Sequence, residues 1–395
     1  MQEETTAVVA QESQTEMRTV VAGVLMYMLA PLGMTLVPLL VGAAAKDLEF
    51  SDSQVGFLAS ADLLGIAAAA VSAPFWLHRI SWRVAGVISI TFVVLGNLLS
   101  SIVVAFEPLC VVRFVTELGS GGLFTLALVS LAKTQNPDRF FAIGIGMTIA
   151  LSVVVFLWLP PVIDARGINV IYIVQGIVAL TVLPFCAWLP PTGQQVEKRG
   201  LEDGQADSFK PLLICFIGFA CVTMAEGGMW SYMERIGAGA GFSSGYVGKV
   251  LAITQVVSFI SALVAAALST RFGRTLPILG AILIFLGGLF LLLQQNTIAY
   301  MVAACLTQFA YIFVIPYLLL MCVELDPSGR FYVLTTAFKM GGFSAGPAVI
   351  ALFLTGNGYA IVSWVGIAFL CVSLLLIIPL SLRLDRKSLS GTAAA

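Results

Sequence analysis

Long, almost unbroken runs of hydrophobic residues fill the chain, and short polar breaks separate them. About 20 apolar residues of helix cross a hydrocarbon core of roughly 30 Å, because a helix satisfies its backbone polar groups without water. The runs are too long and too evenly apolar for the alternating strands of a barrel. The pattern therefore predicts twelve membrane-spanning helices, at 19–43, 54–77, 84–105, 109–132, 140–162, 169–190, 211–234, 246–268, 276–294, 298–322, 332–355 and 360–382.

Composition favours the same class of protein. Hydrophobic residues make up 59% of the chain and charged residues 10%, with a mean hydropathy of +1.01, far from the balance of a soluble domain. We expect an all-α, polytopic membrane protein whose solvent is the lipid bilayer. Residues 1–17 are polar and acidic without a basic n-region, so we expect no cleaved leader.

Charge distribution predicts the orientation. With the N-terminus inside, 14 Lys and Arg residues fall on the cytoplasmic side and 4 in the outer loops, out of 20. The positive-inside rule then places both termini in the cytoplasm, as expected for a plasma (inner) membrane protein. The net charge of −1 carries no sign of a nucleic-acid partner.

Residues typical of metal sites and of hydrolytic catalysis are sparse. Seven cysteines are scattered through apolar segments without metal-ligand spacing, and His78 is the only histidine of the sequence. We read the cysteines as small buried hydrophobes. The sequence predicts no metal site, no cofactor and no enzymatic activity.

A short motif occurs twice. "FSDSQVG" at 50–56 and "FSSGYVG" at 242–248 lie 192 positions apart, and each precedes an apolar span that ends in a basic turn. Six spans per copy is an even number, so the copies share one orientation. The duplication predicts a cytoplasmic tail at 1–18, a six-helix bundle at 19–190, a cytoplasmic linker at 191–210, a second six-helix bundle at 211–382 and a cytoplasmic tail at 383–395.

The basic turns carry a resemblance. "PFWLHRISWR" contains Arg79 and Arg83, and "ALSTRFGR" contains Arg271, Gly273 and Arg274. Both partly match the G-x-x-x-D-R-x-G-R-R loop of the major facilitator superfamily of secondary transporters. "RFVTELGSGGL" at 113–123 resembles the superfamily's R-F-x-x-G-x-G-x-G-G pattern in the fourth span.

The resemblance implies two pseudo-symmetric six-helix bundles, alternating access to a central site, and a gating role for these loop residues. The G-P-x-x-G-G element of exchangers is missing from the fifth span. The resemblance thus leaves the direction of transport open. We expect a monomer.

Five ionisable residues inside predicted spans stand out: Asp62, Arg113, Glu117, Glu226 and Lys339. Each costs about 2.5–3.5 kcal/mol on insertion scales, so each is expected to face a cavity or a partner. Under the repeat offset, the counterparts of both glutamates, Asp62 and Lys339 are uncharged. Charged residues that serve only the shared fold would occur in both copies of the repeat. Because these residues occur in one copy only, we favour a functional role for them.

Glu226 is the first candidate for a proton carrier, because no cation lies within one helical turn and burial favours a neutral carboxyl. Glu117 and Asp62 are the next candidates. The alternatives are structural: Arg113 and Glu117 are spaced to pair along one helix, and Asp62 and Lys339 could tie the halves together when the inner side closes.

The hypothesis that follows is a proton-coupled secondary transporter of a small organic solute, working by alternating access. Arg113 and Lys339 would attract an anionic solute, and Trp230, Gln308 and Tyr311 are candidate wall residues. Two alternatives stay open: a proton-coupled exporter of hydrophobic compounds, and a protein of the same fold that acts as a sensor or assembly factor.

Overall fold

The structure, a computed structural model, describes residues 2–190, 209–326, 331–354 and 358–392. The predicted linker at 191–210 lies outside the described residues except for its last two, which begin α8. The elements are α1 (Gln2–Leu29), α2 (Leu32–Asp47), α3 (Asp52–Trp76), α4 (Trp82–Ser100), α5 (Phe106–Ala132), α6 (Pro137–Arg166), α7 (Asn169–Val182), the 3₁₀ helix η1 (Leu183–Trp188), α8 (Phe209–Gly239), α9 (Ser244–Leu268), α10 (Thr275–Leu292), α11 (Thr297–Leu325), α12 (Tyr332–Phe353) and α13 (Ala360–Thr392).

Twelve helical stretches of the described chain are long and apolar enough to cross a membrane, which confirms the predicted number. Two of these spans are broken. The first consists of α1 and α2 with a break before Pro31, and the sixth consists of α7 and η1, whose second residue is Pro184. Proline cannot donate a backbone hydrogen bond and clashes with the preceding turn, so the helix changes direction or type there.

The last helix is longer than predicted. The charged residues from Arg383 onward mark the end of the apolar run, yet α13 continues to Thr392. Asp385 holds this extension against the start of α10, where it accepts hydrogen bonds from the backbone N–H groups of Arg274 and Thr275. A polar anchor between helices, which hydropathy does not register, therefore extends the helix.

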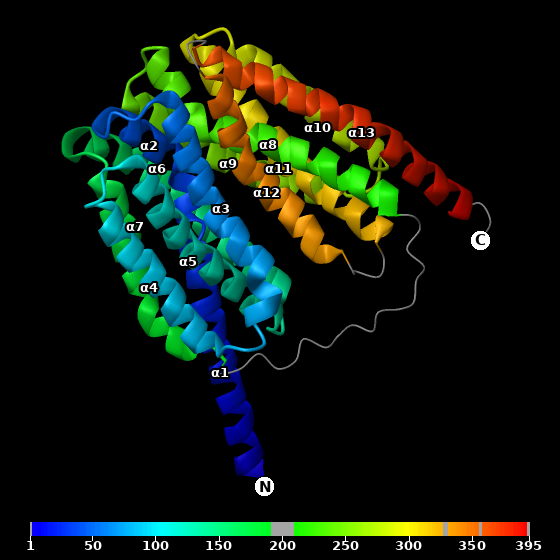
Figure 1. Cartoon of the computed structure of the whole chain (residues 1–395). Helices are drawn as coiled ribbons and strands as arrows, with labels where there is room; N and C mark the ends of the chain where they lie inside the picture. The colour runs from blue at the N-terminus through cyan, green and yellow to red at the C-terminus, as the bar shows by residue number, and fades with distance from the viewer. Residues whose placement is uncertain (1, 191–208, 327–330, 355–357, 393–395) are drawn as a thin grey trace.

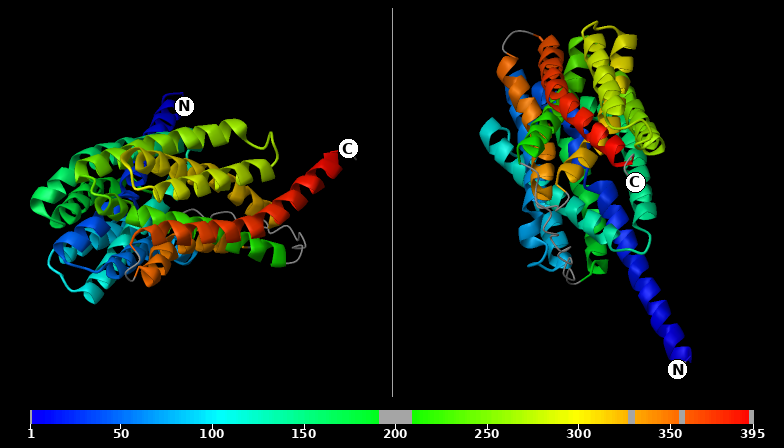
Figure 2. Two further views of the ribbon diagram at one scale, coloured as in Figure 1. Left: turned by 90° about the horizontal axis from the view of Figure 1, so that it is seen from above. Right: turned by 90° about the vertical axis from the view of Figure 1, so that its right-hand side faces the viewer.

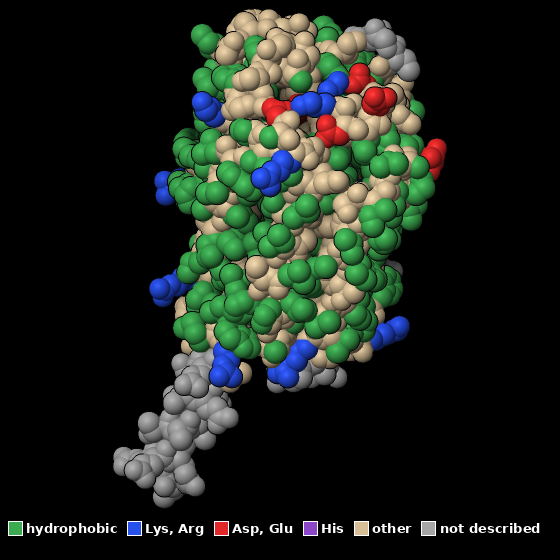
Figure 3. Space-filling model, turned by 90° about the vertical axis from the view of Figure 1, so that its left-hand side faces the viewer, with side chains coloured by type: hydrophobic (Ala, Val, Ile, Leu, Met, Phe, Trp, Pro, Cys, Tyr) green, Lys and Arg blue, Asp and Glu red, His purple; other side chains and the backbone are tan. Residues whose placement is uncertain are grey.

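The helices form two bundles that lie side by side, α1 to η1 in one half and α8 to α13 in the other (Figure 1, Figure 2). A broad band of hydrophobic side chains covers the face shown in Figure 3, as expected for a surface in contact with lipid. Following the predicted orientation, we call the end that carries residues 48–51, 167–168 and 240–243 the outer end, and the opposite end the inner end.

The repeated motif begins α3 and α9. Ser51 caps α3 by accepting a hydrogen bond from the backbone N–H of Gln54, and Ser243 caps α9 by accepting one from Tyr246. Such caps satisfy the orphan N–H groups of a helix start. The glycine that ends each motif permits close packing across the halves: Gly56 lies against Pro347 and Ala351 of α12, and Gly248 against Phe156 and Pro160 of α6.

Candidate functional site

A cavity of about 330 Å³ lies between the two halves, at the lower end of the range of about 300–1,000 Å³ typical of ligand pockets. The first half contributes Met34 and Thr35 of α2 and Ile145 and Ile149 of α6. Helices α8, α9, α11 and α12 form most of the wall, including Glu226, Trp230, Gln255, Ser258, Gln308 and Tyr311.

Glu226 is the acidic residue of this wall, and its side chain is 1% exposed. Its Oε1 accepts a hydrogen bond from Gln308 Nε2 at 2.7 Å, whereas Oε2 has no hydrogen-bond partner in the described structure. None of the ion pairs among the described residues includes Glu226. A buried carboxyl oxygen without a partner is costly, so this oxygen is a candidate site for a proton or a ligand.

Trp230 joins the halves at the same wall. Its indole Nε1 donates to the backbone carbonyl of Met34 at 3.2 Å, and its ring contacts Phe156 edge to face. Four residues that the sequence predicts for the site, Glu226, Trp230, Gln308 and Tyr311, thus line one cavity.

A second polar cluster lies inside the first half, around Arg113 of α5. Asp62 accepts from Arg113 Nε at 2.7 Å and from Nη2 at 3.0 Å, and Glu117 accepts from Nη2 at 2.8 Å. Asn97 of α4 and Gln175 of α7 accept from Nη1 at 3.0 and 3.3 Å. All five N–H donors of the guanidinium therefore have acceptors.

The Arg113 cluster is closed off from the cavity. Arg113 is 0% exposed, and Asp62 and Glu117 are each 1% exposed. None of the three is among the residues that line the cavity. The pairing of Arg113 with Glu117, at positions i and i+4, matches the structural alternative drawn from the sequence. In this conformation Arg113 binds both neighbouring carboxylates, Asp62 and Glu117, within the first half.

Lys339 lies on α12, one helical turn inward of Phe343, which lines the cavity. No ion pair or hydrogen bond to Lys339 occurs among the described residues. Asp62 is bonded to Arg113 instead. The pairing of Asp62 with Lys339 was expected with the inner side closed, and for that state it stays a prediction.

Polar contacts between the halves gather at the outer end. Asp52, at the start of α3, accepts a hydrogen bond from Tyr359 at 2.5 Å and lies 3.5 Å from Arg235 of α8. Its backbone carbonyl accepts from Tyr232 at 2.8 Å. Burial and the neighbouring Asp52 raise the pKa of Tyr359 to about 12, so the phenol stays protonated and remains a donor.

A matching contact joins the halves between α9 and α6. Ser244, which occupies in the second motif the position of Asp52 in the first, donates a hydrogen bond to Asp164 of α6. Asp164 also pairs with Lys46 at 2.9 Å. In each motif, the residue that follows the capping serine thus binds across to the other half, from α3 in one case and from α9 in the other. These contacts close the outer end.

Comparison with known sequences agrees with this architecture. Residues 23–347 match the sequence model of the Major Facilitator Superfamily. The chain belongs to the major facilitator superfamily. No curated protein sequence matches the chain.

Solved structures of superfamily members share the fold. The nucleoside transporter NupG is 15% identical, with a TM-score of 0.70 over 93% of this chain and 98% of its own. The partially occluded, inward-open xylose transporter XylE from E. coli is 13% identical, with a TM-score of 0.71 over 92% and 97%. A bacterial homolog of the human lysosomal transporter Spinster, inward-facing and unoccupied, is 14% identical, with a TM-score of 0.66 over 93% and 95%.

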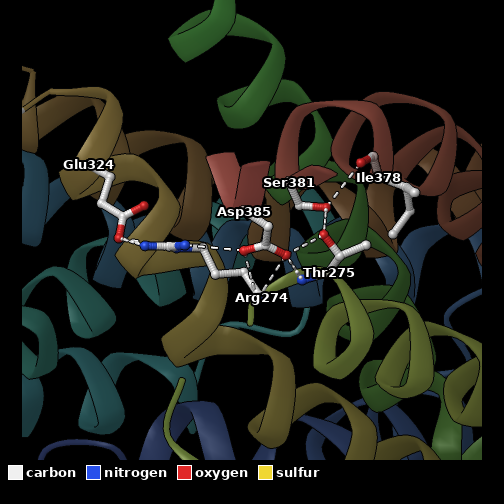
Figure 4. Close-up of polar contacts among 6 residues, drawn as sticks. All are labelled: Arg274, Thr275, Glu324, Ile378, Ser381 and Asp385. Carbon is white, nitrogen blue, oxygen red and sulfur yellow. Dashed lines mark hydrogen bonds and ion pairs between the residues drawn. The ribbon is translucent and has the colours of Figure 1, made fainter. Parts of the chain in front are cut away.

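The superfamily's basic loops occupy the inner end. Arg274 binds Glu324 of α11 and Asp385 of α13, the latter at 3.1 Å (Figure 4). Asp385 in turn accepts from Thr275, whose hydroxyl also contacts Ser381. This network joins three helices of the second half to one another rather than to the first half.

The other loop residues make fewer contacts. Arg83 donates from Nε to the carbonyl of Leu189 at 2.7 Å, Gly273 donates to Thr270, and Arg79 and Arg271 are exposed. Their predicted gating role stays a prediction. Among the described residues, no group of three or more His, Cys, Asp or Glu side chains could hold a metal ion.

Several residues of these sites escaped prediction from the sequence. Gln255 and Ser258 line the cavity, Asn97 and Gln175 complete the Arg113 cluster, and Asp52 holds the outer end. The first four are neutral polar residues inside apolar spans, a signal weaker than charge. Asp52 is the first residue of α3, and an acidic residue is common at the start of a helix and marks nothing by itself.

Proposed function

We propose that this superfamily member couples the movement of a small organic solute to that of protons, and that Glu226 carries the proton. The observation that supports this most is the free Oε2 of Glu226, a buried carboxyl oxygen in a cavity to which both halves contribute. A carboxyl in such a place binds a proton readily and releases it when its surroundings change.

Alternating access supplies that change of surroundings. The contacts of Asp52 and Ser244 close the outer end here, and rocking of one bundle against the other would break them and expose the cavity to the opposite side. Glu226 would then meet the two aqueous phases in turn. Glu117 and Asp62 are second choices, because both are engaged by Arg113 in this conformation.

The test measures proton movement caused by solutes. Vesicles containing the purified protein and the pH dye pyranine are exposed in turn to xylose, uridine, phenylacetate and phenethylamine. We expect at least one solute to change the internal pH beyond the change in protein-free vesicles. The Glu226→Gln variant, which keeps the shape of a protonated carboxyl, is expected to lose that change.

The matched control is Glu107→Gln, which removes the same charge from an exposed position in the first turn of α5. It should behave as the wild type does. Wild-type protein that moves protons with none of these solutes would favour the sensor or assembly alternative. A Glu226→Gln variant that keeps the full response would exclude Glu226 as the carrier.

A further inference from the structure

Proline residues inside the membrane helices change the cavity's chemistry. In a helix, the carbonyl of residue i accepts from the N–H of residue i+4, and a proline at i+4 has no N–H to give. Pro38, Pro316 and Pro347 lie inside α2, α11 and α12. They deprive the carbonyls of Met34, Ile312 and Phe343 of their helical donors, and these three residues all line the cavity.

Two of the carbonyls that prolines free in this protein have side-chain donors. The carbonyl of Met34 accepts from the Trp230 indole at 3.2 Å. Pro31 frees the carbonyl of Tyr27 in the same way, and Thr148 Oγ1 lies 3.3 Å from it. Buried carbonyls usually find such partners, because leaving them unpaired is costly.

Two freed carbonyls at the cavity have no side-chain donor among the described residues. These are the carbonyls of Ile312 and Phe343. The Phe343 carbonyl lies against Gly227, the residue that follows Glu226. Because the Phe343 carbonyl is occupied by this close helix contact, the cavity offers a ligand the carboxyl oxygen of Glu226 without a partner and, at Ile312, one carbonyl without its helical donor.

The remaining wall fits a cation with an apolar body. Trp230, Phe259, Tyr311 and Phe343 supply aromatic rings, whose faces attract cations. The residues that line the cavity include Glu226 and contain no Lys or Arg. An anion placed there would meet a carboxyl and electron-rich groups, with no positive charge among the lining residues.

We infer that the solute is an organic ammonium ion, whose N–H groups bind Glu226 Oε2 and the proline-freed carbonyl of Ile312 while its apolar body packs among the aromatic rings. This inference rests on the proposed function and names its substrate class. It replaces the anionic solute that Arg113 and Lys339 suggested from the sequence, because Arg113 is saturated outside the cavity. The ammonium and the coupling proton compete for one oxygen of Glu226. The protein would therefore move the ammonium in one direction across the membrane and the proton in the other.

The neighbours of Glu226 leave this competition intact. Helix α11 presents Tyr311, and α12 carries Lys339 one turn, about 5.4 Å, inward of Phe343. The lining residues of α2, α6 and α9 include no titratable group. Ammonium binding is therefore expected to strengthen as the pH rises and the proton leaves Glu226.

The test compares three ligands with the same phenyl body: phenethylammonium, 2-phenylethanol and 3-phenylpropionate. Calorimetric titration of the purified full-length protein should show phenethylammonium binding more tightly than the alcohol by about tenfold or more, because hydrogen bonds to charged groups are the stronger ones. Phenylpropionate should not bind. Glu226→Gln should lose the preference for the ammonium and its pH dependence, whereas Glu107→Gln should keep both.

A second measurement needs no variant at Glu226. Dicyclohexylcarbodiimide modifies carboxyl groups in apolar surroundings, and mass spectrometry locates the modified residue. Phenethylammonium should protect Glu226 in the wild type, and phenylpropionate should not. Equal protection by both ligands, or binding of phenylpropionate as tight as that of phenethylammonium, would overturn the inference.

The two proposals fail separately. Phenethylammonium binding at Glu226 without proton movement in vesicles would refute the coupling and support the substrate class. Proton movement driven by xylose, uridine or phenylacetate, without phenethylammonium binding, would support the coupling and refute the substrate class.

Discussion

Arg113 makes charge-assisted hydrogen bonds to two carboxylates in a place that water does not reach. Bringing an ion pair into such a place costs several kcal/mol per ion, and the bonds within the cluster offset that cost only while every partner is present. The cluster also joins four helices, α3, α4, α5 and α7. We therefore expect its first role to be holding the helices of the first half together.

Removal of the guanidinium tests this role. We expect Arg113→Met to destabilise the protein by about 3–5 kcal/mol, because Asp62 and Glu117 would remain buried side by side without a cation. A large fall in the melting temperature of the purified protein is the measurement.

The comparison for that variant is Lys46→Met, which breaks a pair whose side chains are 58% and 46% exposed and should cost at most about 1 kcal/mol. Arg113→Met combined with Glu117→Gln should melt above Arg113→Met alone. Equal melting temperatures for Arg113→Met and Lys46→Met would refute the role.

Charge inside apolar spans predicted most of the site's ionisable residues. It did not predict which of them line the cavity and which form the Arg113 cluster. The sequence offers Arg113 a partner in Glu117 and offers Glu226 no cation within one helical turn, but it does not show the full set of partners of either residue. Only the fold shows that Arg113 finds all its partners within one half, whereas Glu226 lines the cavity between the halves and has one buried carboxyl oxygen without a partner. Pairing across distant helices decides this, and no local pattern records it.

The helices α3 and α9 bring the same local design to opposite seams. A serine caps each helix start, and a glycine five residues later lets the helix approach the other half. A side chain on Gly56 would place its Cβ 2.9 Å from the carbonyl oxygen of Pro347, and one on Gly248 would place it 2.7 Å from Cγ of Pro160. Larger residues at either position would push the seam apart.

We therefore expect Gly248→Leu to favour a conformation with the outer end open. Spin labels on Arg166→Cys and Ala238→Cys, in a background without the seven native cysteines, report the separation of the halves at that end. The distribution of distances should shift to longer values by several Å, as rocking of the bundles requires.

Gly245→Leu is the matched control, because Gly245 lies in the same motif and its added Cβ would meet nothing within 4 Å. This variant should keep the wild-type distances. If Gly248→Leu keeps them too, close packing at the motif glycine does not hold the outer end closed.

The elements themselves were largely predictable. Continuous hydrophobicity in a chain of this composition predicts helices in lipid, and the twelve spans follow. The break before Pro31 and the extension of α13 past Arg383 were missed. The first depends on how a single proline redirects a helix within an apolar run, and the second on Asp385 meeting Arg274 far away in the chain.

The arrangement of the whole molecule makes the orientation testable. On the face shown in Figure 3, acidic side chains gather toward the end opposite the N-terminal helix. The predicted excess of Lys and Arg on the cytoplasmic side places that end outside. Residues 163–168, the last turn of α6 and the loop after it, would then face the exterior, and the linker at 191–210 the cytoplasm.

Labelling of sealed cells checks this orientation. A maleimide that cannot cross membranes should react with Arg166→Cys in intact cells and with Thr192→Cys only after the cells are opened. Opening the cells serves as the control for reactivity of both positions. The reverse pattern of labelling would invert the topology and, with it, the assignment of the closed end as the outer one.

The bond from the Trp230 indole to the Met34 carbonyl crosses between the halves at the wall of the cavity. Any motion that separates α2 from α8 breaks this bond and leaves the indole to water or to a solute. Tryptophan emission shifts to longer wavelengths as the surroundings of the ring become more polar. Once the other five tryptophans of the chain are replaced, the emission of Trp230 is expected to report the parting of the halves in real time without an attached dye.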